Sequence, residues 1–185
     1  MTRSALLPMA AVIATFGCRG PTAQGRPLIL AESDGEHLLH RPPPSALSNL
    51  NAPFIIKVDP KTAGSTDFFL MTEDIAPGQK ISPHRHLHSE EIIFVHAGTG
   101  LATLGEREAV VETGATIYLP KNTVFTMRST GTGPLRIVVI FSRPGFEEYM
   151  REISVPEGQV PQPLTLEELS AIRARHRSHA VYESP

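Results

Sequence analysis

Residues 78–98 read GQKISPHRHLHSEEIIFVHAG and place three metal-binding side chains in two short runs of strand-forming residues. His84 and His86 are two positions apart, so on an extended strand both side chains project from the same face. Glu91 belongs to the next run, EEIIFV, after a predicted turn at residues 87–90. Two imidazoles and one carboxylate form the ligand set of open facial sites for iron(II) and similar divalent metals. The stretch therefore predicts a metal site between two neighbouring strands.

The spacing of these residues resembles the first sequence motif of the cupin family. That motif runs Gly, five residues, His-x-His, four residues, Glu, six residues and a second Gly, and this chain fits every position. The matching residues are Gly78, His84, His86, Glu91 and Gly98. The alternative is a pair of surface histidines on an edge strand, and five matched positions in one short stretch argue against it. The resemblance implies a jelly-roll barrel that holds a metal through the two histidines and the glutamate.

The second cupin motif, in the segment GATIYLPKNTVFTMRS, is only partly present. Gly114 and Pro120 fit it. Three positions differ, because the segment has Asn122 for a Gly, Phe125 for a His and Ser129 for an Asn. The first change is mild, since Asn tolerates the positive φ of a turn. The missing His is the third imidazole ligand of the family, and a phenyl ring cannot coordinate a metal.

Without that imidazole, three protein ligands leave about three positions open on an octahedral ion, enough for a bidentate substrate and dioxygen. Both histidines bind metal only when neutral, so binding is expected to weaken below their usual pKa of about 6.5. His88 could replace the missing ligand only if the strand continued through Leu87, and a solvated loop position is favoured instead. Phe125 and Met127 share a strand face and are expected to form the apolar wall of a substrate pocket, although a thioether also suits copper(I).

Strand-like runs separated by turn residues continue on both sides of the motif, with no alternation of strands and helices. The series predicts an all-β fold over residues 53–143, a double-stranded β-helix or jelly-roll barrel of the cupin type. Asp34-Gly35 is a hairpin signal, so residues 27–32 and 36–41 are expected to pair as an N-terminal arm. The predicted barrel strands cover residues 54–58, 67–75, 90–97, 101–104, 108–112, 115–119, 124–129 and 135–141.

Helices are predicted only in a C-terminal extension, residues 144–185. Residues 146–153 form a short amphipathic run, and Thr165 with Glu168 has the pattern of a capping box at the start of a second helix. The arginines of that helix could contact a partner or an anionic surface, and a solvated charged face is favoured. The side chains expected to pack on the barrel are Leu166, Leu169 and Ile172.

Residues 1–17 resemble an export signal, with one early basic residue and an apolar run shorter than the ~20 residues of a transmembrane helix. Cys18, the only cysteine in the chain, stands where a bacterial lipoprotein signal is cut and the cysteine lipidated. Thr15 and Phe16 depart from that pattern, and the alternatives are an ordinary secretory signal or a buried intracellular cysteine. The expected product is exported, either periplasmic or a membrane-anchored lipoprotein, with residues 18–52 as tether and arm.

Composition and motifs exclude several classes of function. The formal net charge is −2 with dispersed basic residues, so no nucleic-acid partner is expected, and no phosphate loop, nucleophile elbow or internal repeat is present. The cupin resemblance implies a metal-dependent enzyme, and an oxygenase acting on a small organic substrate is expected. Iron or manganese is expected first, with zinc, nickel and copper as alternatives.

The second hypothesis is a non-catalytic module that binds or senses a small molecule at the cell envelope. Barrels of this type are commonly dimers, so a homodimer is among the expected states.

Overall fold

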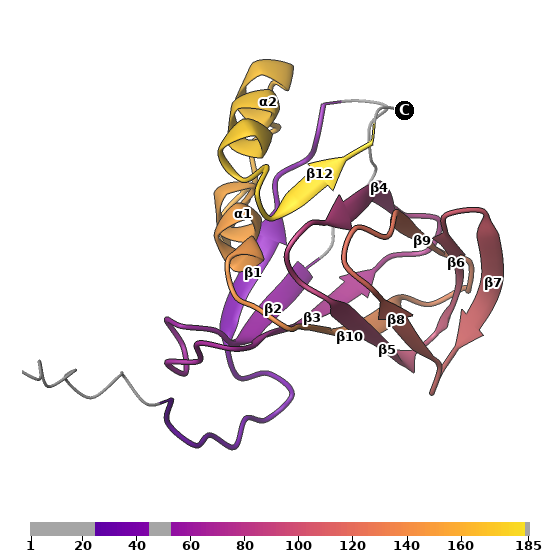
Figure 1. The fold of residues 1–185 in the computed structure, drawn as a ribbon, viewed down its shortest axis with the longest axis horizontal. Helices are drawn as coiled ribbons and strands as arrows, with labels where there is room; N and C mark the ends of the chain where they lie inside the picture. The colour runs from indigo at the N-terminus through magenta and orange to yellow at the C-terminus, as the bar shows by residue number, and fades with distance from the viewer. Residues whose placement is uncertain (1–24, 45–52, 184–185) are drawn as a thin grey trace, which may run out of the picture.

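The computed structural model describes residues 25–44 and 53–183, which form two antiparallel sheets facing one another with two short helices at one end (Figure 1). This arrangement confirms the predicted jelly-roll barrel with C-terminal helices. The predicted export signal and Cys18 lie outside the described residues. The strands are β1 (Glu36–His40), β2 (Pro53–Val58), β3 (Phe69–Ile75), β4 (Lys80–His86), β5 (Glu91–Ala97), β6 (Thr99–Leu104), β7 (Arg107–Glu112), β8 (Thr116–Leu119), β9 (Phe125–Ser129), β10 (Leu135–Phe141), β11 (Ser154–Pro156) and β12 (Ala180–Tyr182), and the helices are α1 (Phe146–Glu152) and α2 (Leu166–Arg175).

The two sheets share the strands in the manner of a jelly roll. The larger sheet has the order β11-β1-β2-β3-β10-β5-β8, and the smaller has the order β12-β4-β9-β6-β7. Strands β4 and β5 are consecutive in sequence but belong to different sheets, so the chain crosses from one layer to the other between them. This crossing lies at residues 87–90 and brings the end of β4 close to the start of β5.

The core lies between the inner faces of the sheets. In β3 and β10 every second residue is buried, as expected for strands with one face on the core. Phe69 of β3 and Phe141 of β10 stack with ring centroids 5.1 Å apart. Phe125 and Met127 of β9 are buried from the opposite sheet. Burial of each such side chain contributes about 1.5–3 kcal/mol to stability, so apolar packing holds the two layers together.

Two turns require the backbone conformations that the motifs predict. Gly98, between β5 and β6, has φ 90°, and a Cβ atom there would lie 2.5 Å from the carbonyl oxygen of Pro134. Asn122 has φ 65° and is the one non-glycine residue with positive φ in the described part of the chain. Its backbone N–H donates to the His86 carbonyl over 2.7 Å. The substitution of Asn for Gly at this position therefore preserves the turn and ties it to β4.

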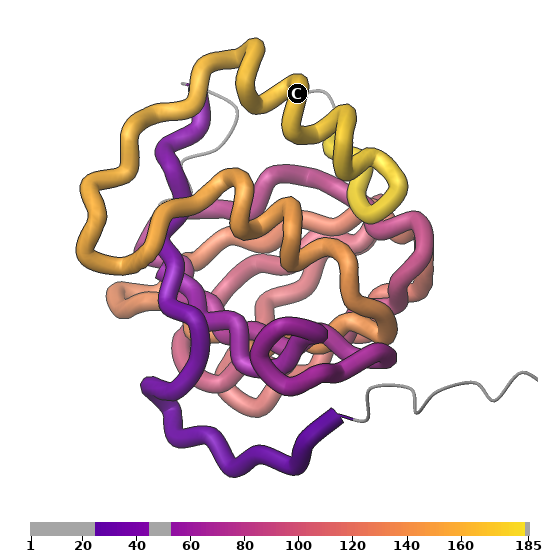
Figure 2. The backbone as a smooth tube through the Cα atoms, turned by 90° about the vertical axis from the view of Figure 1, so that its left-hand side faces the viewer, coloured from indigo at the N-terminus to yellow at the C-terminus, as the bar shows by residue number. Residues whose placement is uncertain are grey.

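The predicted N-terminal hairpin does not form. The turn at Asp34-Gly35 is present, because the Asp34 carboxylate accepts the Ala31 N–H over 2.7 Å, but residues 27–32 are not in a strand. Both edges of β1 are already paired, one with β2 and the other with β11, so no edge is left for residues 27–32. That segment instead runs along the outside of the barrel (Figure 2), where the Lys57 ammonium donates to the Ala31 carbonyl over 3.0 Å.

The C-terminal segment adds a strand to each sheet as well as the two predicted helices. The capping box is confirmed, since the Thr165 hydroxyl accepts the Glu168 N–H over 3.1 Å and the Glu168 carboxylate accepts the Thr165 N–H over 2.7 Å. Leu169 and Ile172 are buried as predicted, whereas Leu166 is 62% exposed because the first turn of α2 extends beyond the core. Neither helix in the described ranges is long and apolar enough to cross a membrane.

Candidate metal centre

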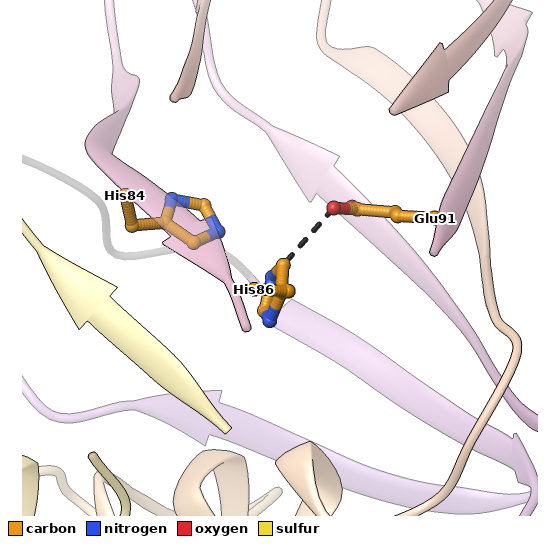
Figure 3. Close-up of side chains that lie close together, drawn as sticks. All are labelled: His84, His86 and Glu91. Atoms are coloured by element: carbon orange, nitrogen blue, oxygen red, sulfur yellow. Dashed lines mark ion pairs between the residues drawn. The ribbon is translucent and has the colours of Figure 1, made fainter. Parts of the chain in front are cut away.

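Three predicted ligands meet where the chain crosses between the sheets. His84 and His86 lie on β4, and Glu91 is the first residue of β5 (Figure 3). One donor atom from each residue lies within 4.8 Å of the other two, and all three side chains are buried. No other group of three or more such ligands occurs in residues 25–44 and 53–183. The structure thus brings together the three residues that the motif spacing indicates.

The hydrogen bonds of the imidazoles fix which nitrogen is available as a ligand. The Nδ1 atom of His84 lies 2.8 Å from the Ser82 carbonyl oxygen, and Nδ1 of His86 lies 3.2 Å from the His179 carbonyl oxygen. A carbonyl only accepts, so each Nδ1 carries the proton and donates it. Each Nε2 therefore presents a lone pair, which is the form that coordinates a metal.

Two of the atoms that could coordinate a metal have no hydrogen-bond partner. His86 Nε2 and Glu91 Oε2 are 3.6 Å apart, too far for a hydrogen bond, and each is buried without another partner. Buried polar atoms without partners cost free energy, on the order of 1–3 kcal/mol each. A cation between these atoms would satisfy both, so the residues present fit a metal ion.

Burial sets the protonation of the site. Burial and the adjacent His84 lower the pKa of His86 from 6.5 to about 3, and burial also lowers the pKa of His84. Burial and the negative charge of Glu73 raise the pKa of Glu91 from 4.5 to about 8. At neutral pH both imidazoles are thus ready to coordinate, and a metal must displace the proton of Glu91. The pH dependence predicted for the histidines therefore belongs to the carboxyl group.

The other residues considered in the sequence take different places. Phe125 pairs across the strands with His84 and lines the adjoining cavity, so a buried phenyl ring occupies the position of the missing ligand. Met127 is fully buried opposite Ala102 and is not among the residues that line this cavity. His88 is exposed in the loop beyond β4, as predicted.

A cavity of about 90 Å³ lies beside His84 and Glu91. Aromatic rings make much of its wall: Tyr182 stacks on His84 with centroids 5.3 Å apart, and Phe146 meets His86 edge-on at 4.5 Å. Tyr182 is placed by β12, which pairs with β4 so that residue 182 lies opposite residue 84. The short run AVY has no sequence signal strong enough to predict this strand. His84 is therefore covered by a residue that lies nearly a hundred positions later in the chain.

Sequence reasoning also missed a buried acid–imidazole pair on the cavity wall. The Glu73 carboxylate lies 3.3 Å from Nε2 of His40, whose Nδ1 lies 3.3 Å from the Ser154 hydroxyl. The His40 ring stacks on Phe54 with centroids 4.6 Å apart. Strict alternation in FLMTEDI could have revealed Glu73, because it points to the core face along with Met71. The pair places a buried carboxylate and a buried imidazole on the cavity wall.

Comparison with known proteins agrees with this geometry. Residues 71–141 match the Cupin domain family. Protein SchB of Streptomyces halstedii is 35% identical over 79 residues, which are 43% of this chain and 57% of SchB, so the chain spans little more than half of that relative.

Two solved structures share the fold. A predicted oxalate decarboxylase from Thermotoga maritima matches over 63% of this chain and 100% of its own, with a TM-score of 0.56 and 11% identity. An RmlC-like cupin from Shewanella frigidimarina matches over 68% of this chain and 98% of its own, with a TM-score of 0.51 and 10% identity. At these identities the likeness shows the fold alone. The family match covers residues 71–141, which extend from β3 to the end of β10, and the two solved structures share the jelly-roll fold.

Proposed function

We propose that this chain binds a divalent transition metal through His84, His86 and Glu91 and is an oxygenase-type enzyme for a small organic substrate. The observation that carries the proposal is the pair of buried, unpartnered donor atoms 3.6 Å apart on His86 and Glu91. Iron or manganese is the expected metal because two imidazoles and a carboxylate with open positions are typical of such sites. Zinc, nickel and copper are the alternatives.

When bound, the ion would supply a Lewis acid and adjacent open positions for substrate and dioxygen. The chain supplies the surroundings. Phe125 and Tyr182 line the cavity with aromatic rings, and the Nδ1 hydrogen bonds hold both imidazoles in a fixed orientation. The Glu73 carboxylate, supported by His40, can accept a proton from a substrate in the cavity.

Phe125 favours a second candidate function. A buried phenyl ring at the position of the fourth ligand is compatible with a barrel that binds or senses a small molecule without catalysis. Three retained ligands with matched spacing favour the enzyme, so we rank a metal site first in either case.

Location and assembly belong to the same proposal. We expect export and lipidation at Cys18, and mass spectrometry of the mature N-terminus is the test: an unmodified first residue other than Cys18 contradicts lipidation. A homodimer is one of the expected states, and light scattering of the purified protein distinguishes it from a monomer.

Metal analysis tests the central claim. Protein purified without chelator should contain close to one equivalent of a transition metal, and His86→Ala should lose it. His88→Ala is a matched control, because it removes an exposed imidazole from the same segment and should keep the metal. Equal, negligible metal in wild type and His86→Ala would refute the site. If metal is present, oxygen consumption with a panel of small acids and phenols distinguishes an enzyme from a binding module.

A further inference from the structure

Arg173, in the last turn of α2, is a cation on the cavity wall that lacks an anion. Its guanidinium carbon lies 4.0 Å from the centre of the Tyr182 ring. The guanidinium also donates a hydrogen bond to the neutral hydroxyl of Tyr149, whereas its buried Nε–H has no acceptor. Arg151, by contrast, contacts the carboxylates of both Glu36 and Asp59 at 2.6 and 2.5 Å. In the part of the chain that the structure describes, no acidic side chain forms an ion pair with Arg173; Glu73 lines the same cavity but contacts His40. A partly buried cation of this kind calls for an acceptor from outside the chain.

The groups in contact with Arg173 are two uncharged phenols, so none of them neutralises its positive charge. Tyr149 and Tyr182 line the same cavity, and burial raises the pKa of both phenols, so they remain neutral O–H groups. The positive charge of Arg173 opposes that shift at both hydroxyls and also acts on His84, so all four groups are within electrostatic reach of one another. A guanidinium has five N–H donors and no acceptor. This end of the cavity therefore has an excess of donors.

The dimensions limit the size of the acceptor. A cavity of about 90 Å³ has room for several water molecules, since about 10–15 Å³ of such space holds one. That space suits a compact molecule of a few heavy atoms and not a polycyclic one. His84 and Glu91 line the same cavity, so a compact molecule held at Arg173 extends toward the metal ligands.

We infer that the cavity takes a small monocarboxylic acid whose carboxylate accepts hydrogen bonds from Arg173. The remainder of the molecule then lies against the aromatic wall and points to His84 and Glu91. Arg173 is a specificity-determining residue in this arrangement, since a fixed fork of N–H donors matches a planar carboxylate. This assignment of a substrate class rests on the proposed enzyme function. Binding of the carboxylate at Arg173 does not itself require the metal.

Isothermal titration calorimetry of the full-length protein tests this with propionate and its neutral isostere propionamide as probes. Wild type should bind propionate and bind propionamide at least about tenfold more weakly, because only the carboxylate makes charge-assisted hydrogen bonds. Arg173→Gln should weaken propionate binding by about tenfold or more. Arg177→Gln is the matched control, as it removes one exposed positive charge just beyond the same helix and should bind like wild type.

Undetectable propionate binding, equal binding of propionate and propionamide, or an Arg173→Gln variant that binds like wild type would each overturn the inference. The comparison of the two probes on wild type needs no variant, so it remains decisive if Arg173→Gln does not fold. Titrations of metal-free and zinc-loaded protein are run in parallel with zinc analysis. Absence of every candidate transition metal from protein purified without chelator counts against the proposed function alone, and loss of the propionate preference in metal-free protein counts against this inference alone.

Discussion

Replacing Glu91 by Gln should stabilise the metal-free protein while abolishing metal binding. The wild-type carboxyl has a pKa near 8 when folded and 4.5 when unfolded, so at pH 7 folding requires it to take up a proton. The interval of about 2.5 units between 4.5 and pH 7 costs about 3 kcal/mol at roughly 1.4 kcal/mol per unit. A glutamine amide does not ionise, so this cost is absent. Its NH₂ group replaces the Glu91 carboxylate oxygen that lies 3.6 Å from His86 Nε2, and it can donate a hydrogen bond to that nitrogen.

The sign of this effect depends on pH. Because the folded pKa is raised, the folded state binds more protons than the unfolded state, and wild-type stability falls as pH rises from 4.5 toward 8. The gain from Glu91→Gln should therefore be close to zero at pH 4, about 3 kcal/mol at pH 7 and about 5 kcal/mol at pH 9, where it is complete.

Urea unfolding of EDTA-treated protein at these three pH values measures the gain. Glu90→Gln is the matched control, since Glu90 is exposed beside Glu91 and its replacement should change the unfolding free energy by less than about 0.5 kcal/mol. Added metal should then stabilise wild type but not Glu91→Gln. A destabilised Glu91→Gln variant at pH 7, or a gain that does not vary with pH, would refute the reasoning.

Two further substitutions test the neighbouring features. Phe125→His should tighten metal binding by about tenfold or more, or about 1.4 kcal/mol, because it places an imidazole directly across from His84. Metal titration against a chelating dye measures the affinity. A Phe125→His affinity no higher than that of Phe125→Leu would contradict the prediction. Gly98→Ala should lower the unfolding free energy by about 1–3 kcal/mol, because φ is 90° and the new Cβ would lie 2.5 Å from the Pro134 oxygen. Gly133→Ala, where the Cβ meets nothing within 4 Å, is its control, and equal denaturation midpoints for the two variants would be the contrary result.

The ligands were predictable because their information is local. His84, His86 and Glu91 lie within eight residues, and strand alternation plus one turn places them together. The positive φ at Asn122 was predictable for the same reason, since it depends on a single turn. The positions of the barrel strands were predictable from short apolar runs with turn residues between them, whereas their arrangement as a jelly roll was implied by the resemblance to cupins.

The rest of the site depends on contacts distant in sequence. Tyr182 reaches His84 only because β12 completes the edge of the smaller sheet, and no pattern in residues 180–182 predicts that pairing. Glu73 lies on β3 and His40 on β1, and the two strands are separated by β2 in the larger sheet. Periodicity alone does not fix the strand register that brings these side chains together. The predicted N-terminal hairpin is absent for the same reason, because β11, which is distant in sequence, pairs with the edge of β1 that the hairpin would need.

The dependence of His86 on the His179 carbonyl links the centre to the order of synthesis. These two residues are 93 positions apart, so during translation His86 leaves the ribosome well before the carbonyl that orients it. Until residues 179–182 dock, His86 lacks this hydrogen bond and Tyr182 does not cover His84. The geometry of the proposed metal site is therefore complete only when residues 179–182 have docked against β4.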